Sequence, residues 1–528
     1  KGDWRTLNER LVIYQRPCLS HEICIHGSYL DLDLEHRYEG TRIGTDMYSA
    51  LRRYLKKEGL LSRAPLYYKN SCAWMRILRK HCVETARMCK YIAGYDLLGA
   101  IDHHWHRSGY PCGVMNEFYE LKPGESVEDV LEYNSESVIL LDCTNNRNLK
   151  SGDVLSLDLY SSLFGEGPLA EGRVDWYLAD DKHHIYQRGE AKVQNISNGK
   201  IEKLMTITFT APEIDIPSKI TLYARLSGRE YDITNQWDFW VFPEFTPVPS
   251  DINVTTEPSI SEKYKSIFNK VQLTNKAQLT NNDEVNSTNG ADIRNIINNT
   301  NNINITNIKY NTNFANNAND ANNANITKNT NNINNTNTIR IVSELDKDIV
   351  EFIAKGGSVI LLGNKPFPVL PTTFQISIAG RVQGNLATVI EDHPLMNRFP
   401  HEGFCDWQFY NMIEEGNAVL FNDLNIPFKP IIEVVSSFKL IRKQASLFEL
   451  GVSKGKLLVC TLNLSETDPA AMYLLGAMIN YVNSDEFKPD TFVSPDELLY
   501  LIDKNLSVKF DFSTDEALDP NVKRKIQM

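Results

Sequence analysis

Over residues 1–120, short apolar runs typical of strands alternate with stretches in which apolar residues recur at helical spacing. The run at residues 17–27 predicts a strand that ends at glycine, with Ser20, Glu22, Cys24 and His26 on one face because side chains alternate along a strand. Thr45 begins a predicted helix that buries Tyr48, Leu51 and Leu55 and stops at Gly59. A longer helix is expected at about 62–91, and a buried strand at 94–101. Strand, crossover helix and strand make a parallel unit.

The spacing changes to period two over residues 136–245. Residues 154–160, 219–226 and 236–242 alternate apolar with polar or aromatic side chains between turn-rich segments. This pattern is typical of an antiparallel sandwich, and its length fits an immunoglobulin-like domain.

The chain becomes rich in Asn and Thr at residues 248–338. This segment has too little apolar surface to offset the entropy of ordering, so a disordered insert is predicted. Its Asn-x-Thr triplets, such as the one at Asn253, are potential glycosylation sites that also arise by chance in such a tract.

Alternation of helix and strand returns at 339–485, followed by a C-terminal extension at 486–528. A helix at 346–355, a buried strand at 358–362, a strand at 455–460 and a helix at 470–482 predict a small doubly wound sheet. No glycine-rich dinucleotide motif follows these strands, so no cofactor is expected.

Charge and composition narrow the class of protein. The 528 residues carry a net charge of −12, which argues against a nucleic acid partner and for neutral or small ligands. No run reaches the roughly 18–20 apolar residues that span a bilayer. Nine scattered cysteines without a CxxC pair predict buried thiols. The chain begins with Lys1, so its location stays open, with a secreted or extracytoplasmic one favoured over the cytoplasm.

Glu22 is the first candidate for chemistry. A glutamate at the carboxyl end of an inner strand is where (β/α) barrels hold their catalytic groups. The alternative is a buried structural carboxylate paired with Arg16 or Arg42. A zinc protease is excluded, because His21 and His26 are five residues apart rather than four.

A second candidate is the cluster at 102–106, Asp-His-His-Trp-His, which follows the second predicted strand. It suits either a metal ion or a barrel mouth in which histidines bond sugar hydroxyls and Trp105 stacks on a sugar ring. We expect the sugar contact and no metal. The pair Asn116-Glu117 is expected to belong to the crossing into the sandwich.

Leu19-Ser-His-Glu-Ile23, the two helices and Gly94-Tyr-Asp-Leu-Leu98 together resemble the last two β/α units of glycoside hydrolase family 2 barrels, in the beta-galactosidase-like branch. Pro400-His-Glu-Gly-Phe-Cys-Asp-Trp-Gln408 and Gly455-Lys-Leu-Leu-Val459 resemble the amidotransferase-like domain of some of these enzymes. The resemblance implies a multidomain α/β plus all-β chain: the C-terminal portion of a (β/α)8 barrel, an immunoglobulin-like sandwich and a flavodoxin-like or amidotransferase-like α/β domain.

By this resemblance Glu22 is the nucleophile of a retaining exo-β-glycosidase that acts on carbohydrate, with His21, Asp102, His104 and Trp105 binding substrate. The family's acid/base lies on strand four, which would precede Lys1, so the fragment alone is expected to be inactive. The α/β domain has Asn364 where an amidotransferase needs cysteine, and Cys460 lies inside a strand, so an interdomain or homo-oligomer contact is expected there. The alternative is a non-catalytic protein that binds carbohydrate or a protein partner.

Overall fold

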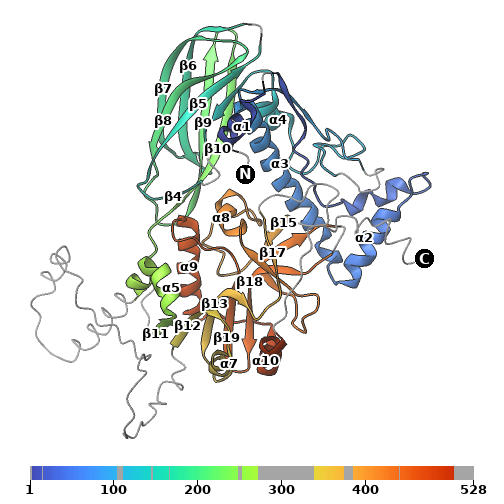
Figure 1. Ribbon diagram of the computed structural model, residues 1–528, viewed down its shortest axis with the longest axis vertical. Helices are drawn as coiled ribbons and strands as arrows, with labels where there is room; N and C mark the ends of the chain where they lie inside the picture. Colours follow the sequence, from blue (N-terminus) through green and yellow to red (C-terminus); the bar gives the residue numbers. More distant parts are fainter. Residues whose placement is uncertain are drawn as a thin grey trace, which may run out of the picture.

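The computed structural model describes residues 3–14, 16–103, 111–143, 147–165, 167–247, 253–271, 338–373, 385–438 and 441–504. They form a mixed α/β molecule with several β-sheets. In Figure 1 the β-sandwich lies at the top, the N-terminal helices lie beside it, and the C-terminal α/β part lies below. Within the described residues, no helix is long and apolar enough to cross a membrane.

The N-terminal part contains a two-stranded parallel sheet and a long helix. Its elements are α1 (Trp4–Leu11), β1 (Cys18–Ile23), η1 (Leu32–Tyr38), α2 (Asp46–Lys57), η2 (Leu61–Arg63), α3 (Ala64–Met88), β2 (Ile92–Leu97) and α4 (Val127–Asn134). The predicted parallel pairing is confirmed, since β1 pairs with β2.

The helix α2 buries Tyr48, Leu51 and Leu55 as predicted, but the side chain of Thr45 does not cap it. The second strand differs more: β2 ends at Leu97 and alternates between half-buried and exposed residues. A sheet of only two strands leaves much of its surface uncovered, so the predicted buried strand at 94–101 is wrong.

The sandwich is made of two packed sheets. Its strands are β3 (Val138–Leu141), β4 (Asn148–Lys150), β5 (Val154–Leu163), β6 (Leu169–Asp180), β7 (Ile185–Ile196), β8 (Lys200–Thr210), β9 (Ser218–Gly228) and β10 (Asp232–Phe242). One sheet has the order β4-β10-β9-β6-β7 and the other β3-β5-β8, and both contribute to a single apolar core. The predicted strands at 154–160, 219–226 and 236–242 lie within β5, β9 and β10, whereas the immunoglobulin-like domain stays a prediction.

The C-terminal part is built around a sheet of ten described strands. Its elements are β11 (Asn253–Thr256), α5 (Pro258–Lys263), β12 (Thr338–Glu344), α7 (Lys347–Ala354), β13 (Ser358–Lys365), β14 (Val369–Pro371), β15 (Asn385–Ile390), η5 (Trp407–Phe409), α8 (Tyr410–Ile413), β16 (Asn417–Leu420), β17 (Pro430–Ser436), β18 (Gln444–Val452), β19 (Gly455–Cys460), α9 (Pro469–Val482), β20 (Phe492–Val493) and α10 (Pro495–Lys504).

Helices cover both faces of this sheet. Ile360 and Leu458 share a core with α9, while Val359 and Leu361 share another with α7 and α10. The neighbours β11, β12, β13 and β19 are parallel, but β18 and the strands beyond it add antiparallel pairs. The sheet is therefore larger and more mixed than the small doubly wound sheet that the sequence predicts.

Two predicted boundaries are wrong. Residues 253–271 fall within the predicted disordered insert, yet β11 extends the sheet and Ile260, Tyr264 and Phe268 are buried in its core. Residues 248–252 and 272–337 of that insert lie outside the described residues. At the other end, β20 pairs with β18 and α10 packs on α7, so residues to 504 belong to the α/β part.

Candidate functional site

Glu22 lies at the carboxyl end of β1, with its side chain 42% exposed. Its backbone N–H donates to an Asp96 carboxylate oxygen at 2.7 Å, and His21 Nδ1 lies 3.0 Å from the other oxygen of Asp96. His21 Nε2 is 3.7 Å from Glu22 Oε1. The hydrogen bond from the Glu22 amide and the neighbouring His21 lower the pKa of Asp96. Glu22 is therefore an accessible carboxylate on an anchored backbone, and among the contacts of the described residues neither Arg16 nor Arg42 pairs with it.

The backbone around Glu22 adopts an uncommon conformation. Glu22 has φ 53° and Cys24 has φ 63°, in the left-handed region that favours glycine. These angles break the strict alternation that the sequence predicts, so Glu22 stays accessible while Cys24 is buried at 7% exposure. Backbone strain of this kind persists where surrounding contacts hold it, and it is concentrated at functional sites.

A thiol cluster lies just beyond Glu22. His26 Nε2 is 3.4 Å from Cys82 Sγ, and Cys24 Sγ lies 3.7 Å from the carbonyl oxygen of Arg79. Hydrogen bonding to Cys24 and to His26 lowers the pKa of Cys82, while hydrogen bonding to Cys82 and burial raise the pKa of Cys24. All nine cysteines are free thiols, and most are buried as predicted.

The second predicted cluster is only partly described. Asp102 is 4% exposed, forms a 2.7 Å ion pair with the buried Lys122, and accepts a hydrogen bond from Gly113 N at 2.7 Å. His104 and Trp105 lie outside the described residues, so their sugar contacts stay predictions. No group of three metal-ligating side chains is present in the part of the chain that the structure describes.

Asn116 and Glu117 have structural contacts. Asn116 Oδ1 accepts from the backbone N–H groups of Phe118 and Glu120, and Glu117 Oε1 accepts from the hydroxyls of Tyr38 and Tyr48, the latter at 2.9 Å. These contacts hold the turn that follows β2 against η1 and α2.

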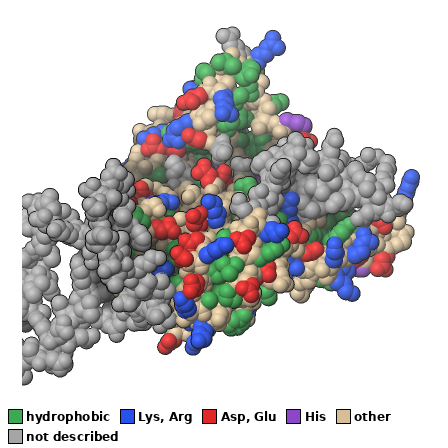
Figure 2. All heavy atoms as spheres, turned by 60° about the horizontal axis from the view of Figure 1, so that its bottom comes forward, with side chains coloured by type: hydrophobic (Ala, Val, Ile, Leu, Met, Phe, Trp, Pro, Cys, Tyr) green, Lys and Arg blue, Asp and Glu red, His purple; other side chains and the backbone are tan. Residues whose placement is uncertain are grey.

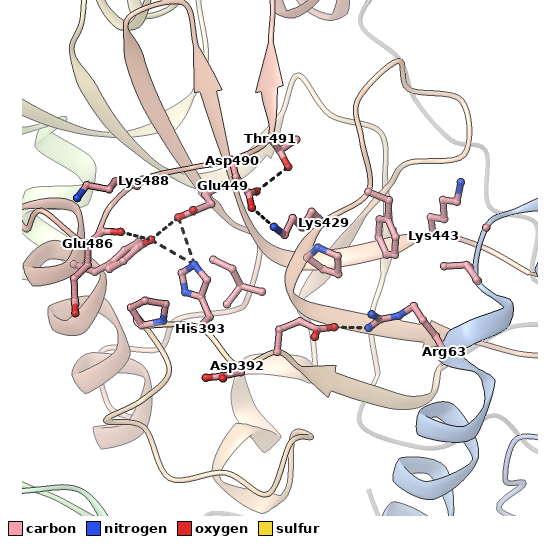
Figure 3. Close-up of a pocket in the computed structure, with 18 of the residues that line it drawn as sticks. Arg63, Asp392, His393, Lys429, Lys443, Glu449, Glu486, Lys488, Asp490 and Thr491 are labelled. Carbon is pink, nitrogen blue, oxygen red and sulfur yellow. Dashed lines mark hydrogen bonds and ion pairs between the residues drawn. The ribbon is translucent and has the colours of Figure 1, made fainter.

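A cavity of about 600 Å³ lies between the N-terminal helices and the α/β part. Figure 3 shows Arg63 reaching it from the N-terminal side, with His393, Glu449 and Glu486 on the opposite side. The Tyr481 hydroxyl donates to Glu449 Oε2 at 2.8 Å and lies 3.4 Å from His393 Nε2. Leu395 N donates to His393 Nδ1 at 3.3 Å, which places the imidazole proton on Nε2.

Sequence reasoning missed this polar cavity. His393, Glu449 and Tyr481 come from a loop, a strand and a helix with no shared motif, so only their packing reveals it. In contrast, Cys460 is buried in β19 as expected, and burial raises the pKa of its thiol to about 12. Cys460 is therefore a neutral thiol at physiological pH, unsuited to the role of an amidotransferase nucleophile.

Comparison with known proteins gives distant likenesses. Residues 340–503 match a family described as Domain of unknown function (DUF8487), and residues 153–243 match Domain of unknown function (DUF8488). No curated protein matches the chain.

Among solved structures, the chain is similar to a family 123 glycoside hydrolase from Clostridium perfringens at 12% identity and a TM-score of 0.17, over 25% of this chain and 32% of that one. A beta-glucuronidase from Parabacteroides merdae matches at 13% identity and TM-score 0.14, over 20% of this chain and 15% of the other. A putative beta-galactosidase from Bacteroides fragilis matches at 10% identity and a TM-score of 0.15, over 23% of this chain and 20% of the other. The chain thus spans a third or less of these proteins, and the resemblance to glycoside hydrolase structures is weak.

Proposed function

We propose that this chain is the C-terminal part of a retaining exo-β-glycosidase of the beta-galactosidase-like kind, with Glu22 as nucleophile. The observation that carries the proposal is the position of Glu22: an accessible carboxylate at the carboxyl end of a parallel strand, on a left-handed backbone anchored by Asp96. Barrel enzymes hold catalytic groups at that end of their strands.

The two-stranded sheet supports the same proposal. Among the described strands β1 pairs only with β2, and Leu19 on β1 is 76% exposed. An apolar side chain beside a free strand edge suits a sheet to which further parallel strands add. In the proposal, strands upstream of Lys1 pack there and supply the acid/base.

The reaction requires two carboxyl groups. A Glu22 oxygen forms a bond to the anomeric carbon as the glycosidic C–O bond breaks, and the second carboxylic acid protonates the leaving oxygen. Water then attacks the same carbon, the second residue takes its proton, and Glu22 is released. In this family the two groups are roughly 5–5.5 Å apart.

A fluorosugar tests the role of Glu22. The protein with its upstream sequence is incubated with 2,4-dinitrophenyl 2-deoxy-2-fluoro-β-D-galactoside, which forms a long-lived covalent intermediate with a retaining nucleophile. We expect mass spectrometry to find one fluorosugar on the peptide that contains Glu22, and Glu22→Gln to lower kcat for aryl β-galactosides by about a thousandfold or more.

The matched control is Glu39→Gln, an exposed glutamate on the same N-terminal part, which is expected to retain activity. Near-normal turnover in Glu22→Gln, or a label on another residue, would remove Glu22 as nucleophile. If the protein with its upstream sequence has no activity at all, the non-catalytic carbohydrate- or protein-binding alternative replaces the enzyme.

A further inference from the structure

A groove separate from the Glu22 strand end lies where the three parts of the molecule meet. It consists of two adjoining cavities of about 300 Å³ each, which share Asp181, Lys219, Glu402 and Asp406. Thr221, Tyr223, Gln236 and Asp238 of β9 and β10 form one wall, and α3, α4 and the loop before η5 form the others.

Three of the four cations that line the cavity beside α3 and α4 already have partners. Arg76 lies 3.3 Å from Asp129, Lys80 lies 2.9 Å from Glu84, and Lys219 lies 2.9 Å from Glu402. The charge of each of these three side chains is therefore already balanced by a carboxylate of the protein.

Arg147 is the exception. It is 7% exposed, its Nε has no hydrogen-bond partner, and its guanidinium carbon lies 5.1 Å from the centre of the Trp407 ring. Among the described residues, no carboxylate forms an ion pair with it. A buried donor nitrogen without an acceptor is costly, so an acceptor placed beside the Arg147 Nε by a ligand would stabilise the protein.

Two carboxylates in the same cavity can also accept further hydrogen bonds. Asp406 accepts a hydrogen bond from Trp407 N at 2.6 Å, and Asp238 accepts one from the Thr221 hydroxyl at 2.6 Å, each through one oxygen. In the part of the chain that the structure describes, their second oxygens make no such bond. The groove therefore offers Arg147 as donor and two acceptors to one bound molecule.

We propose that this groove binds a neutral saccharide. Seven carboxylates against four cations in the cavity beside α3 and α4 disfavour an anion, and the buried Arg147 disfavours a cation. A sugar ring carries several hydroxyls that both donate and accept, which matches Arg147, Asp238 and Asp406. Tyr223, stacked on Tyr177 at 4.7 Å, gives a fixed aromatic face for the C–H side of the ring.

Saturation-transfer NMR on the whole chain tests this binding. The probes are methyl β-D-galactoside and cellobiose as neutral sugars, D-glucuronate as an anion and D-glucosamine as a cation. We expect transfer to at least one neutral probe, an affinity about tenfold lower in Asp238→Ala and in Tyr223→Ala, and loss of binding in Arg147→Met. The Asp238 and Tyr223 variants keep the test valid if Arg147→Met fails to fold.

The matched control is Asp232→Ala, which changes the same residue type on β10 at an exposed position paired with Arg225. It is expected to bind like the unaltered chain, as is Glu22→Gln, so failure of the proposed nucleophile leaves this site standing. No transfer to either neutral probe at about 10 mM, tighter binding of glucuronate or glucosamine, or equal losses in Asp232→Ala and Asp238→Ala would overturn the proposal.

Discussion

At the scale of single residues, burial and, after it, the nearby Asp238 and Glu402 raise the pKa of the Asp406 carboxyl to about 7, against the opposing effects of the Trp407 amide and Arg147. The ordinary value is 3.8. Between these values the native state binds more protons at Asp406 than the unfolded state does. This residue therefore lowers stability as the pH rises through that window, and the cost persists above it.

Asp406→Asn removes that titration and can keep the hydrogen bond to Trp407 N. Relative to the unaltered chain, we expect the variant to gain unfolding free energy between pH 4 and pH 8, by as much as about 4 kcal/mol. Urea unfolding at the two pH values measures the change. A difference between the two proteins that stays constant with pH would contradict the assignment.

At the scale of elements, two aspartates begin helices in different surroundings. The Asp346 side chain accepts from Ile349 N at 2.8 Å, at the exposed start of α7. Asp468 accepts from Ala470 N at the start of α9 and also from the side-chain amides of Asn148 and Asn411. Asp468 is 1% exposed, so it joins α9 to the sandwich and to α8 as well as capping a helix.

Replacing each aspartate by alanine separates these roles. Asp346→Ala is expected to cost about 1 kcal/mol, the usual value for a lost N-cap. Asp468→Ala should cost about 3 kcal/mol or more, because it also leaves buried amide donors with fewer acceptors. Urea unfolding compares the two variants, and equal losses would show that the contacts of Asp468 to the other elements contribute little.

At the scale of the whole molecule, charged contacts join the N-terminal helices to the α/β part. Arg63 pairs with Glu391 at 2.5 Å and with Glu433, which is 1% exposed and also accepts from Tyr67. Asn70 of α3 donates to the carbonyl oxygens of Thr388 and Gly403, each at 3.0 Å. Figure 2 shows basic and acidic side chains interspersed on one outer face of the molecule.

Removing the charge of Arg63 tests this contact between the parts. Arg63→Met leaves Glu433 buried without its cation, and we expect a loss of about 3–5 kcal/mol. Glu433→Gln in the same chain should recover part of it. Lys270→Met, which removes an exposed pair with Glu244, is the control and should cost under about 1 kcal/mol. Urea unfolding measures the free energy of unfolding of each variant. Similar losses of unfolding free energy in Arg63→Met and Lys270→Met would contradict a special role for Arg63.

The local pattern of apolar and polar residues was sufficient to predict many helices and strands of this chain. The apolar spacing of Tyr48, Leu51 and Leu55 predicted the buried face of α2, and the apolar run at 455–460 coincides with β19. Such signals depend on neighbours within a few residues, so the sequence alone carries them. The sequence also supplied Glu22 as a candidate and its place at a strand end.

Only the tertiary structure decided how these elements combine. The exposure of Glu22 depends on positive φ angles and on Asp96, which is 74 residues away. The groove at Arg147 is lined by residues from three parts of the chain. The strand β11 belongs to the sheet because it pairs with β12. Periodicity reports which side chains share a face, whereas burial, pairing and pKa depend on partners distant in sequence.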